Sequence, residues 1–228
     1  MNKIENPALR IGALILAAGE GSRMGRMPKC LIRLEGQTLL ERLRDALSSM
    51  GVARVVVVTG YHAEAIEKTL SLMPSKPSKP PLQVVRNPSP EAGQQSSVRI
   101  GLQTLGAEFD LILVALADQP GVGSEELSEL ISAFRHRPEG KDIVVPVVDG
   151  QRGNPVAFSG ALIAELLAGG LKGGLRAYID AHPEAVHRFA TGNPNFTLDL
   201  DTREDVERLS RSRGLQVQWP AAALGSPG

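Results

Sequence analysis

Short apolar runs alternate with amphipathic segments along the chain, and this alternation predicts strands and helices in turn. The runs at 11–18, 54–59, 111–117 and 143–148 contain few or no polar side chains. Such runs are typical of parallel strands that are covered on both faces. Between the first two runs, leucines recur at positions 39, 40, 43 and 47, which is the spacing of an amphipathic helix. We therefore expect a three-layer α/β/α sandwich with a mainly parallel, Rossmann-like sheet.

The same pattern predicts the remaining elements. We expect strands at 82–86 and 186–190, extended segments at 31–34 and 154–158, and helices at 38–50, 63–72, 94–105, 125–135, 161–167, 175–181 and 205–213. Thr38 and Glu41 predict a capping box, and Ser124 predicts the N-cap of a later helix. A proline-rich connection at 74–81 cannot be helical. No repeat or boundary appears, so we expect one domain over 1–228 with flexible tails at 1–10 and 216–228.

Composition narrows the class of protein. Acidic and basic residues balance at 25 each in 228 residues, so no large electrostatic field favours nucleic acid. The only cysteine, Cys30, excludes an internal disulfide framework and fits a reducing cytoplasm. The apolar runs fall far short of the ~20 residues that span a bilayer, and the N-terminal stretch lacks a signal core. We expect a cytoplasmic protein that binds neither nucleic acid nor membrane.

The first predicted strand leads into a glycine-rich, basic stretch that ends at Lys29. Gly19 and Gly21 allow a sharp turn, and successive backbone N–H groups in such a turn can bind an anion. Neither a Walker loop nor a dinucleotide fingerprint fits, because Met24 stands where the last glycine belongs and no Gly-Lys-Ser/Thr follows. The stretch therefore predicts a loop around the phosphates of a nucleotide. The alternative is an ordinary turn after a strand.

Three aspartates are candidates for a metal site: one follows a predicted strand, and two lie in an extended segment near the end of the chain. Asp118 comes directly after seven apolar residues, and a buried charge there is costly unless it is paired or holds a metal. Mg²⁺ takes one or two carboxylates together with substrate phosphates and water; the alternative is an aspartate that caps the following turn. Asp199 and Asp201 lie in an extended segment, and we expect only one of them to point at a site. Asp201 could instead cap the helix after it.

Five short motifs occur in order across residues 11–209, and each falls at a predicted strand end or helix start. They are Leu16–Lys29 (LAAGEGSRMGRMPK), Asn87-Pro88 with Gly93–Arg99 (GQQSSVR), Leu116–Pro120 (LADQP), Arg152–Val156 (RGNPV) and Asp199–Asp205 (DLDTRED). Together they resemble the MobA/MocA-like nucleotidyltransferases of the molybdenum cofactor. More broadly, they resemble enzymes that load CTP, GTP or UTP onto phosphorylated acceptors. The resemblance implies the fold of the nucleotide-diphospho-sugar transferases.

The resemblance also implies a reaction and its residues. A phosphate monoester, here molybdopterin, attacks the α-phosphorus of a nucleoside triphosphate, here CTP, with Mg²⁺ as cofactor, and pyrophosphate leaves. A molybdenum hydroxylase apoenzyme is a candidate partner. The implied catalytic residues are Lys29, Arg23 and Asp118; the metal ligands are Asp118 and Asp201; and the acceptor-binding residues are Gln119, Arg152, Gly153, Asn154 and Pro155. The implied nucleotide-binding residues are Leu16, Ala17, Ala18, Gly19, Glu20, Gly21, Ser22, Arg23, Lys29, Asn87, Gly93, Ser96, Ser97 and Asp118.

Two positions depart from the family pattern. Asn154 stands where the family has histidine, which leaves the acceptor open, and Arg203 replaces a proline in an early helical turn. The alternatives are a guanylyltransferase, a transferase acting on a sugar 1-phosphate or another small phosphorylated acceptor, and a non-catalytic nucleotide-binding accessory protein for a molybdenum hydroxylase. The four histidines form no metal-ligand spacing with one another or with Cys30, so we expect them at the surface or in packing.

Overall fold

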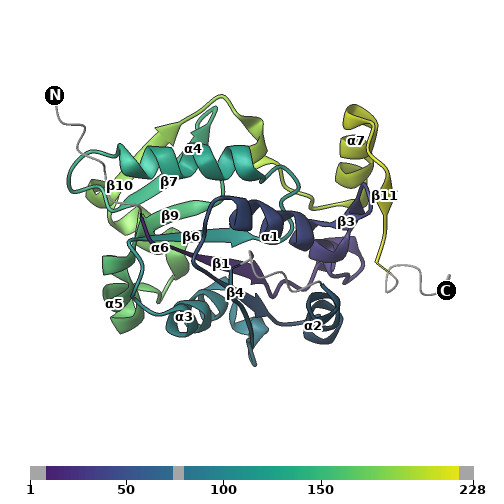
Figure 1. Cartoon of the computed structure of the whole chain (residues 1–228), viewed down its shortest axis with the longest axis horizontal. Helices are drawn as coiled ribbons and strands as arrows, with labels where there is room; N and C mark the ends of the chain where they lie inside the picture. Colours follow the sequence, from purple (N-terminus) through teal and green to yellow (C-terminus); the bar gives the residue numbers. More distant parts are fainter. Residues whose placement is uncertain (1–8, 74–79, 221–228) are drawn as a thin grey trace.

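The computed structural model describes residues 9–73 and 80–220, and a mainly parallel sheet lies at its centre (Figure 1). Within these residues the sheet has eight strands in the order β10-β7-β9-β6-β1-β4-β5, and β8 pairs with β7. Only β8 and β9 run antiparallel to their described neighbours, so the predicted sheet is confirmed. Its strands are β1 Ile11–Ala17, β4 Arg54–Thr59, β5 Leu82–Arg86, β6 Leu111–Leu116, β7 Ile143–Val148, β8 Gln151–Arg152, β9 Val156–Ser159 and β10 Val186–Ala190.

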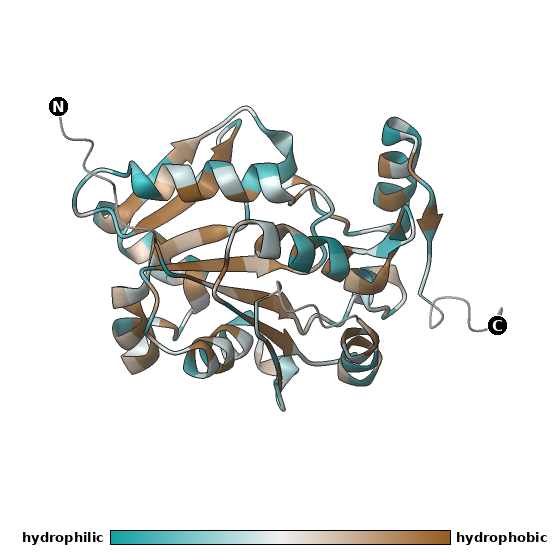
Figure 2. Ribbon diagram, viewed as in Figure 1, coloured by the Kyte–Doolittle hydropathy of each residue, from teal (hydrophilic) through white to brown (hydrophobic). Residues whose placement is uncertain are grey.

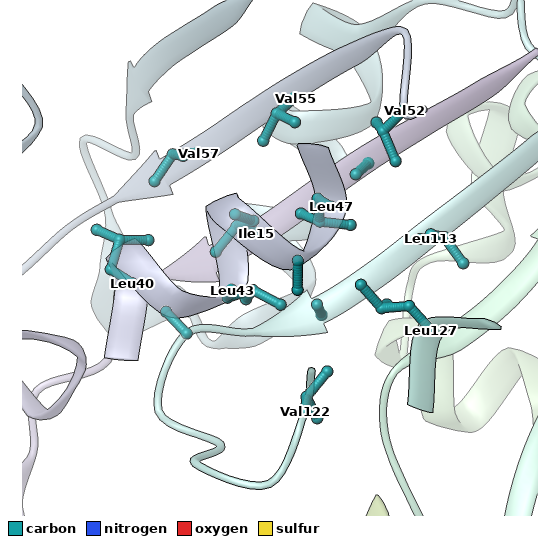
Figure 3. Packing of buried hydrophobic residues seen from close by; sticks show 14 of the residues in the cluster. Ile15, Leu40, Leu43, Leu47, Val52, Val55, Val57, Leu113, Val122 and Leu127 are labelled. Carbon is teal, nitrogen blue, oxygen red and sulfur yellow. The ribbon is translucent and has the colours of Figure 1, made fainter. Parts of the chain in front are cut away.

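Helices cover both faces of this sheet, which confirms the three-layer sandwich. The side chains of β1 alternate between the layers: Ile15 packs with helices on one face and Leu14 with helices on the other. The strands are apolar along most of their length (Figure 2), and Figure 3 shows Leu40, Leu43 and Leu47 seated over Ile15. The first face carries α1 Leu39–Ser49, α2 Ala63–Leu72 and α4 Ser124–Arg135, and the second carries α3 Gln94–Leu105, α5 Ile163–Glu165 and α6 Gly174–Ala181.

A smaller cluster lies at one end of the main sheet, where Figure 1 shows α7 (Arg203–Arg213) beside β11 (Val217–Gln218). There β11 pairs with β2 (Arg33–Leu34), and β2 pairs with β3 (Gln37–Thr38). Met24 and Met27 pack in this cluster with Leu200 and with Val206 of α7. The cluster therefore fastens the segment after the glycine turn to the segment that carries Asp201.

The described short helical turns are η1 Ser22–Met24, η2 Lys29–Leu31, η3 Pro90–Ala92, η4 Gly160–Leu162, η5 Leu166–Gly170, η6 Pro183–Ala185 and η7 Pro194–Thr197. The helix predicted at 161–167 is confirmed as a continuous helical segment that passes through three helical forms, and it kinks at Gly169, beyond the predicted end. No helix among the described residues is both long and apolar enough to cross a bilayer.

The ends of the elements confirm one predicted cap and correct another. Thr38 forms the predicted capping box with Glu41. Ser124 is not an N-cap: it is the first residue of α4, and Gly123 precedes it with its N–H bonded to the Glu126 carboxylate.

The chain termini differ from the prediction of flexible tails at 1–10 and 216–228. The Arg10 N–H donates to Asp110, and Val217 pairs with Leu34 in β11. Both residues are therefore held by partners on other segments. The rest of both predicted tails, 1–8 and 221–228, and most of the proline-rich connection, 74–79, lie outside the described residues.

Candidate active site

A cavity of about 420 Å³ opens at the edge of the sheet where β6, β1, β4 and β5 end. Ligands of open α/β sheets bind at the carboxyl ends of strands, and the volume suits a small molecule. Most of the nucleotide-site residues predicted from the sequence line this cavity, and so does Asp201. The lining residues that were predicted are Leu16, Ala17, Ala18, Gly19, Glu20, Gly21, Ser22, Arg23, Lys29, Gly93, Ser97, Asp118 and Asp201.

The glycine turn after β1 is tightly folded. Gly21 has a φ of 68°, and a side chain there would place Cβ 2.2 Å from the Met27 carbonyl oxygen, so only glycine fits. The Gly21 carbonyl accepts from the N–H groups of Met24 and Arg26. From outside the turn, His62 Nε2 lies 2.8 Å from the Glu20 carbonyl oxygen. His62 therefore has a packing role, in support of this loop.

Two carboxylates and two cations meet in the cavity. Lys29 Nζ lies 2.9 Å from Asp201 Oδ1 and 3.7 Å from Asp118 Oδ2, and Arg23 Nη1 lies 2.8 Å from Asp201 Oδ2. Burial raises the pKa of Asp118, and Lys29 opposes that rise. The hydrogen bond from Lys29 lowers the pKa of Asp201. The ammonium group thus holds together two carboxylates that would otherwise repel each other.

Asp201 reaches the cavity because its neighbours in the chain are anchored elsewhere. Leu200 is buried in the small cluster under α7, and Thr202 is the N-cap of α7, with a capping box to Asp205. The alternative that Asp201 itself caps the helix is therefore wrong. On the other side of Leu200, Asp199 Oδ1 accepts from Gln119 Nε2 at 2.8 Å. Of the two aspartates, Asp201 lines the cavity and Asp199 does not, as expected if one of them belongs to a site.

The segment between β5 and α3 divides into a lining part and a supporting part. Gly93 and Ser97 line the cavity. Asn87 is 2% exposed, and its Nδ2 donates to Ser96 Oγ at 2.8 Å and to Ser97 Oγ at 2.9 Å. Asn87 and Ser96 do not appear in the cavity lining and instead hold the turn into α3. Arg99, in the same motif, donates to the Leu167 carbonyl oxygen on the other side of α3.

The residues predicted to bind the acceptor lie beyond the cavity lining, and most have partners within the protein. Arg152 forms an ion pair with Asp180, and the Asn154 N–H donates to the Phe196 carbonyl oxygen at 2.9 Å. Gly153 packs directly against Phe196, and the Asn154–Pro155 peptide bond is cis. Gln119 is 4% exposed, and its Oε1 is buried without a hydrogen-bond partner. Their role toward an acceptor stays a prediction.

Comparison with known proteins identifies the family. The model of the "MobA-like NTP transferase domain" matches residues 13–186. This chain belongs to the MobA-like NTP transferase family. The resemblance inferred from the five motifs is therefore confirmed, and the glycine turn, Asp118 and the 152–156 segment all fall within the matched region.

Several known proteins are similar to this MobA-like chain over most of its length. Nicotine blue oxidoreductase from Paenarthrobacter nicotinovorans is 29% identical over 87% of this chain and 96% of its own. Bifunctional protein GlmU from Rhizorhabdus wittichii is 34% identical over 67% of this chain but only 31% of its own. Among solved structures, a nucleotidyl transferase from Methanothermobacter (Mth528) superposes with a TM-score of 0.69 at 26% identity, covering 89% of this chain and 97% of the other.

A buried polar network braces the MobA-like site from behind. The carboxylate of Glu126, which is 3% exposed, accepts from the Gly123 N–H at 2.9 Å, Asn193 Nδ2 at 3.0 Å and Asn195 Nδ2 at 2.6 Å. We call these four residues the Glu126 clasp. It joins the loop after Asp118 to the segment that leads to Asp201. Burial alone would raise the pKa of Glu126, but the hydrogen bonds from Asn195 and Asn193 outweigh it and lower the pKa.

The clasp and part of the cavity lining were not predicted from the sequence. The clasp has a weak local signal, a glutamate three residues into a helix start, whereas its asparagine partners are distant in sequence. Most of the unpredicted lining residues lie in or beside the predicted motifs, and Tyr61 follows β4; the full set is Cys30, Tyr61, Pro90, Gln94, Leu116 and Ala117. The strand-end rule, applied to β4, would have found Tyr61. Burial raises the pKa of Cys30 to about 12, so its thiol is neutral and a poor nucleophile.

Proposed function

We propose that this protein is a Mg²⁺-dependent nucleotidyltransferase that transfers the cytidylyl group of CTP to molybdopterin and releases pyrophosphate. One observation carries the proposal: the Lys29 ammonium lies within 4 Å of the carboxylates of both Asp118 and Asp201, in a cavity formed by the glycine turn. Membership of a family of NTP transferases supports the same reaction class.

The donor set fits a magnesium ion that enters with its nucleotide. Asp118 and Asp201 keep 38% and 50% of their side chains exposed, and they already share one cation, the Lys29 ammonium. Among the described residues, no group of three or more histidine, cysteine or acidic side chains forms a metal site. Mg²⁺ needs only one or two carboxylates when substrate phosphates complete its shell. When bound, it would neutralise charge on the reacting phosphate.

The chain's own residues supply positioning and charge. Residues 18–22 of the glycine turn line the cavity, and their backbone N–H groups would bind the phosphates. Lys29 and Arg23 would stabilise the charge that builds up as the bond between the α- and β-phosphates breaks. The acceptor's phosphate oxygen forms the new bond to the α-phosphorus, and pyrophosphate leaves. No general base is needed, because a phosphate monoester is ionised near neutral pH.

The choice of CTP and molybdopterin rests on the sequence motifs alone. The Ala-Ala-Gly and Ser-Ser-Val-Arg patterns are closer to the cytidylyl branch of the resemblance than to the guanylyl branch. A sugar 1-phosphate or another small phosphorylated acceptor is the second candidate, since Asn154 departs from the family histidine. We place the reaction in the cytoplasm, where Cys30 would stay reduced, with a molybdenum hydroxylase apoenzyme as the candidate recipient of the product.

The test is pyrophosphate release by the full chain with Mg²⁺, each of the four nucleoside triphosphates in turn, and molybdopterin as acceptor. We expect release with CTP and loss of release when EDTA removes the metal. Release with GTP alone would keep the mechanism and replace the donor. Nucleotide binding without release would point to a sugar 1-phosphate acceptor, tested next, and then to a non-catalytic accessory protein.

A second assay tests for oxidoreductase activity, because one relative is named as an oxidoreductase. The same preparation is mixed with nicotine blue and a reducing cofactor, and the absorbance of the dye is followed. Turnover there, with no pyrophosphate release under any condition, would overturn the proposed function.

A further inference from the structure

The cavity has a charged end and an uncharged end. The sheet order places β6 beside β1, β1 beside β4, and β4 beside β5. The charged lining residues follow β6 and β1 or stand against them: Glu20, Arg23, Lys29, Asp118 and Asp201. After β4 and β5 the lining is uncharged and consists of Tyr61, Pro90, Gly93, Gln94 and Ser97. A nucleoside triphosphate is divided in the same way, into a charged chain of phosphates and an uncharged base.

Tyr61 is unusual among the described residues because it is large, partly apolar and open. It is 46% exposed, and within residues 9–73 and 80–220 the other exposed large hydrophobic residue is Leu72, at 76%. Leu72 lies at the end of α2 away from the cavity lining, whereas Tyr61 is the one aromatic lining residue in the described part of the chain. An open aromatic ring at the uncharged end of a cavity is a surface on which a flat ring can stack.

The backbone around Tyr61 is fixed to the glycine turn. A side chain at Gly60 would place Cβ 2.8 Å from Ala18 Cβ, so the two segments touch. The Tyr61 N–H lies 3.5 Å from the Ala18 carbonyl oxygen, and His62 Nε2 lies 2.8 Å from the Glu20 carbonyl oxygen. The backbone that carries Tyr61 is therefore held in place relative to the loop that would bind phosphates, which reduces the ordering cost of binding.

We propose that the ring of Tyr61 is the surface on which the base of the bound nucleotide stacks. This inference rests on the proposed function, from which it takes the class of ligand. Every base has a π-face, so stacking adds affinity without choosing among bases. Tyr61 would therefore strengthen the binding of all four nucleoside triphosphates and leave the binding of the phosphates alone unchanged.

The test compares nucleotide binding with phosphate binding by titration calorimetry in Mg²⁺. The ligands are CTP, GTP and inorganic tripolyphosphate, and the variants are Tyr61→Phe, Tyr61→Leu and Tyr61→Ala. Leu72→Ala is the matched control, because it removes the other exposed large side chain outside the cavity. We expect Tyr61→Ala and Tyr61→Leu to weaken both nucleotides by about 5- to 150-fold. Tyr61→Phe and Leu72→Ala should match the wild type, and tripolyphosphate should bind all five proteins alike.

Three results would overturn the stacking role. Wild-type affinity of Tyr61→Ala for CTP and GTP would show that the ring contributes nothing. An equal loss for tripolyphosphate would show that Tyr61 acts by holding the glycine turn. Failure of the wild type to bind any nucleotide would show that the ligand is not a nucleotide. Because binding is measured without turnover, a Tyr61-dependent affinity in a protein that releases no pyrophosphate would support the stacking surface while the proposed function fails.

Discussion

Carboxylates have opposite surroundings in the cavity, on one side of Asp118, and in the Glu126 clasp, on the other. Toward β1, the side chains of Asp118 and Asp201 are 38% and 50% exposed, and their described partners are flexible cations. Away from β1, the Glu126 carboxylate is 3% exposed and accepts three hydrogen bonds from fixed groups. The first arrangement leaves oxygens that a ligand can reach. The second leaves none, so its work is to hold the structure around the first.

The difference teaches that accessibility and the mobility of the partner separate a binding carboxylate from a supporting one. Lysine and arginine can turn to new partners when a phosphate enters, whereas the Asn193 and Asn195 amides are held in a tight turn. Variants on the two sides should therefore fail in different measurements. Variants on the open side should lose activity, and variants in the clasp should lose stability.

The largest expected effect is the loss of activity in Asp118→Asn. The change keeps the shape of the side chain and removes the charge, so pyrophosphate release should fall by about 100- to 1,000-fold. The midpoint of urea unfolding should hold or rise, since burial disfavours the charged form of Asp118. Both quantities are measured on the same preparation. Asp142→Asn, an exposed aspartate paired with Arg137, serves as the matched control, and full activity in Asp118→Asn would refute the assignment.

The next effect is the loss of stability in Glu126→Ala. The change leaves the part-buried donors of Asn193, Asn195 and Gly123 without their acceptor. We expect the free energy of unfolding, measured in urea, to fall by about 1–3 kcal/mol. Glu125→Ala, one residue earlier and exposed, should change it little. If Glu126→Ala unfolds like the wild type yet loses activity as Asp118→Asn does, the clasp is part of the site and the comparison above is wrong.

Acidification gives a smaller effect with a definite sign. The pKa of Glu126 in the folded protein is below its ordinary value of 4.5. Its stabilising contribution is therefore complete above that value and is lost as the pH falls toward the folded pKa. Between roughly pH 5 and pH 3, wild-type stability should fall more steeply than that of Glu126→Gln, which cannot titrate there. Parallel curves for the two proteins would show that Glu126 is not ionised in the fold.

The fold was predictable because its signals are local. The apolar runs, the leucine spacing of α1 and the Thr38 capping box each lie within a few residues, and the structure has them where the sequence placed them. The Ser124 cap failed because the sequence shows that a serine is present but not that the preceding glycine's N–H is already bonded to Glu126. The helix at 161–167 is present, but apolar spacing does not show that it passes through three helical forms.

The site was predictable only in part, for a related reason. Motifs identified the residues that follow β1 and β6, because strand ends meet at one edge. They could not separate Ser97, which lines the cavity, from Ser96, which bonds to Asn87 behind it. They also could not show that Arg99 faces Leu167 or that Arg152 is paired with Asp180. Those contacts join segments that are distant in sequence, so they depend on the fold rather than on the motif.

The smallest expected effect on stability comes from Arg152. Variants of this residue also test whether it binds the acceptor or only supports the site. Its ion pair with Asp180 lies near solvent, and such pairs add little to stability, so Arg152→Ala should unfold like the wild type. If the acceptor's phosphate takes the place of Asp180, Arg152→Ala should raise the KM for the acceptor and leave the KM for CTP unchanged. Asp180→Asn should do the reverse and lower the KM for the acceptor, because it frees the guanidinium. Unchanged acceptor kinetics in both variants would remove Arg152 from the acceptor site and leave it, like the Glu126 clasp, as support.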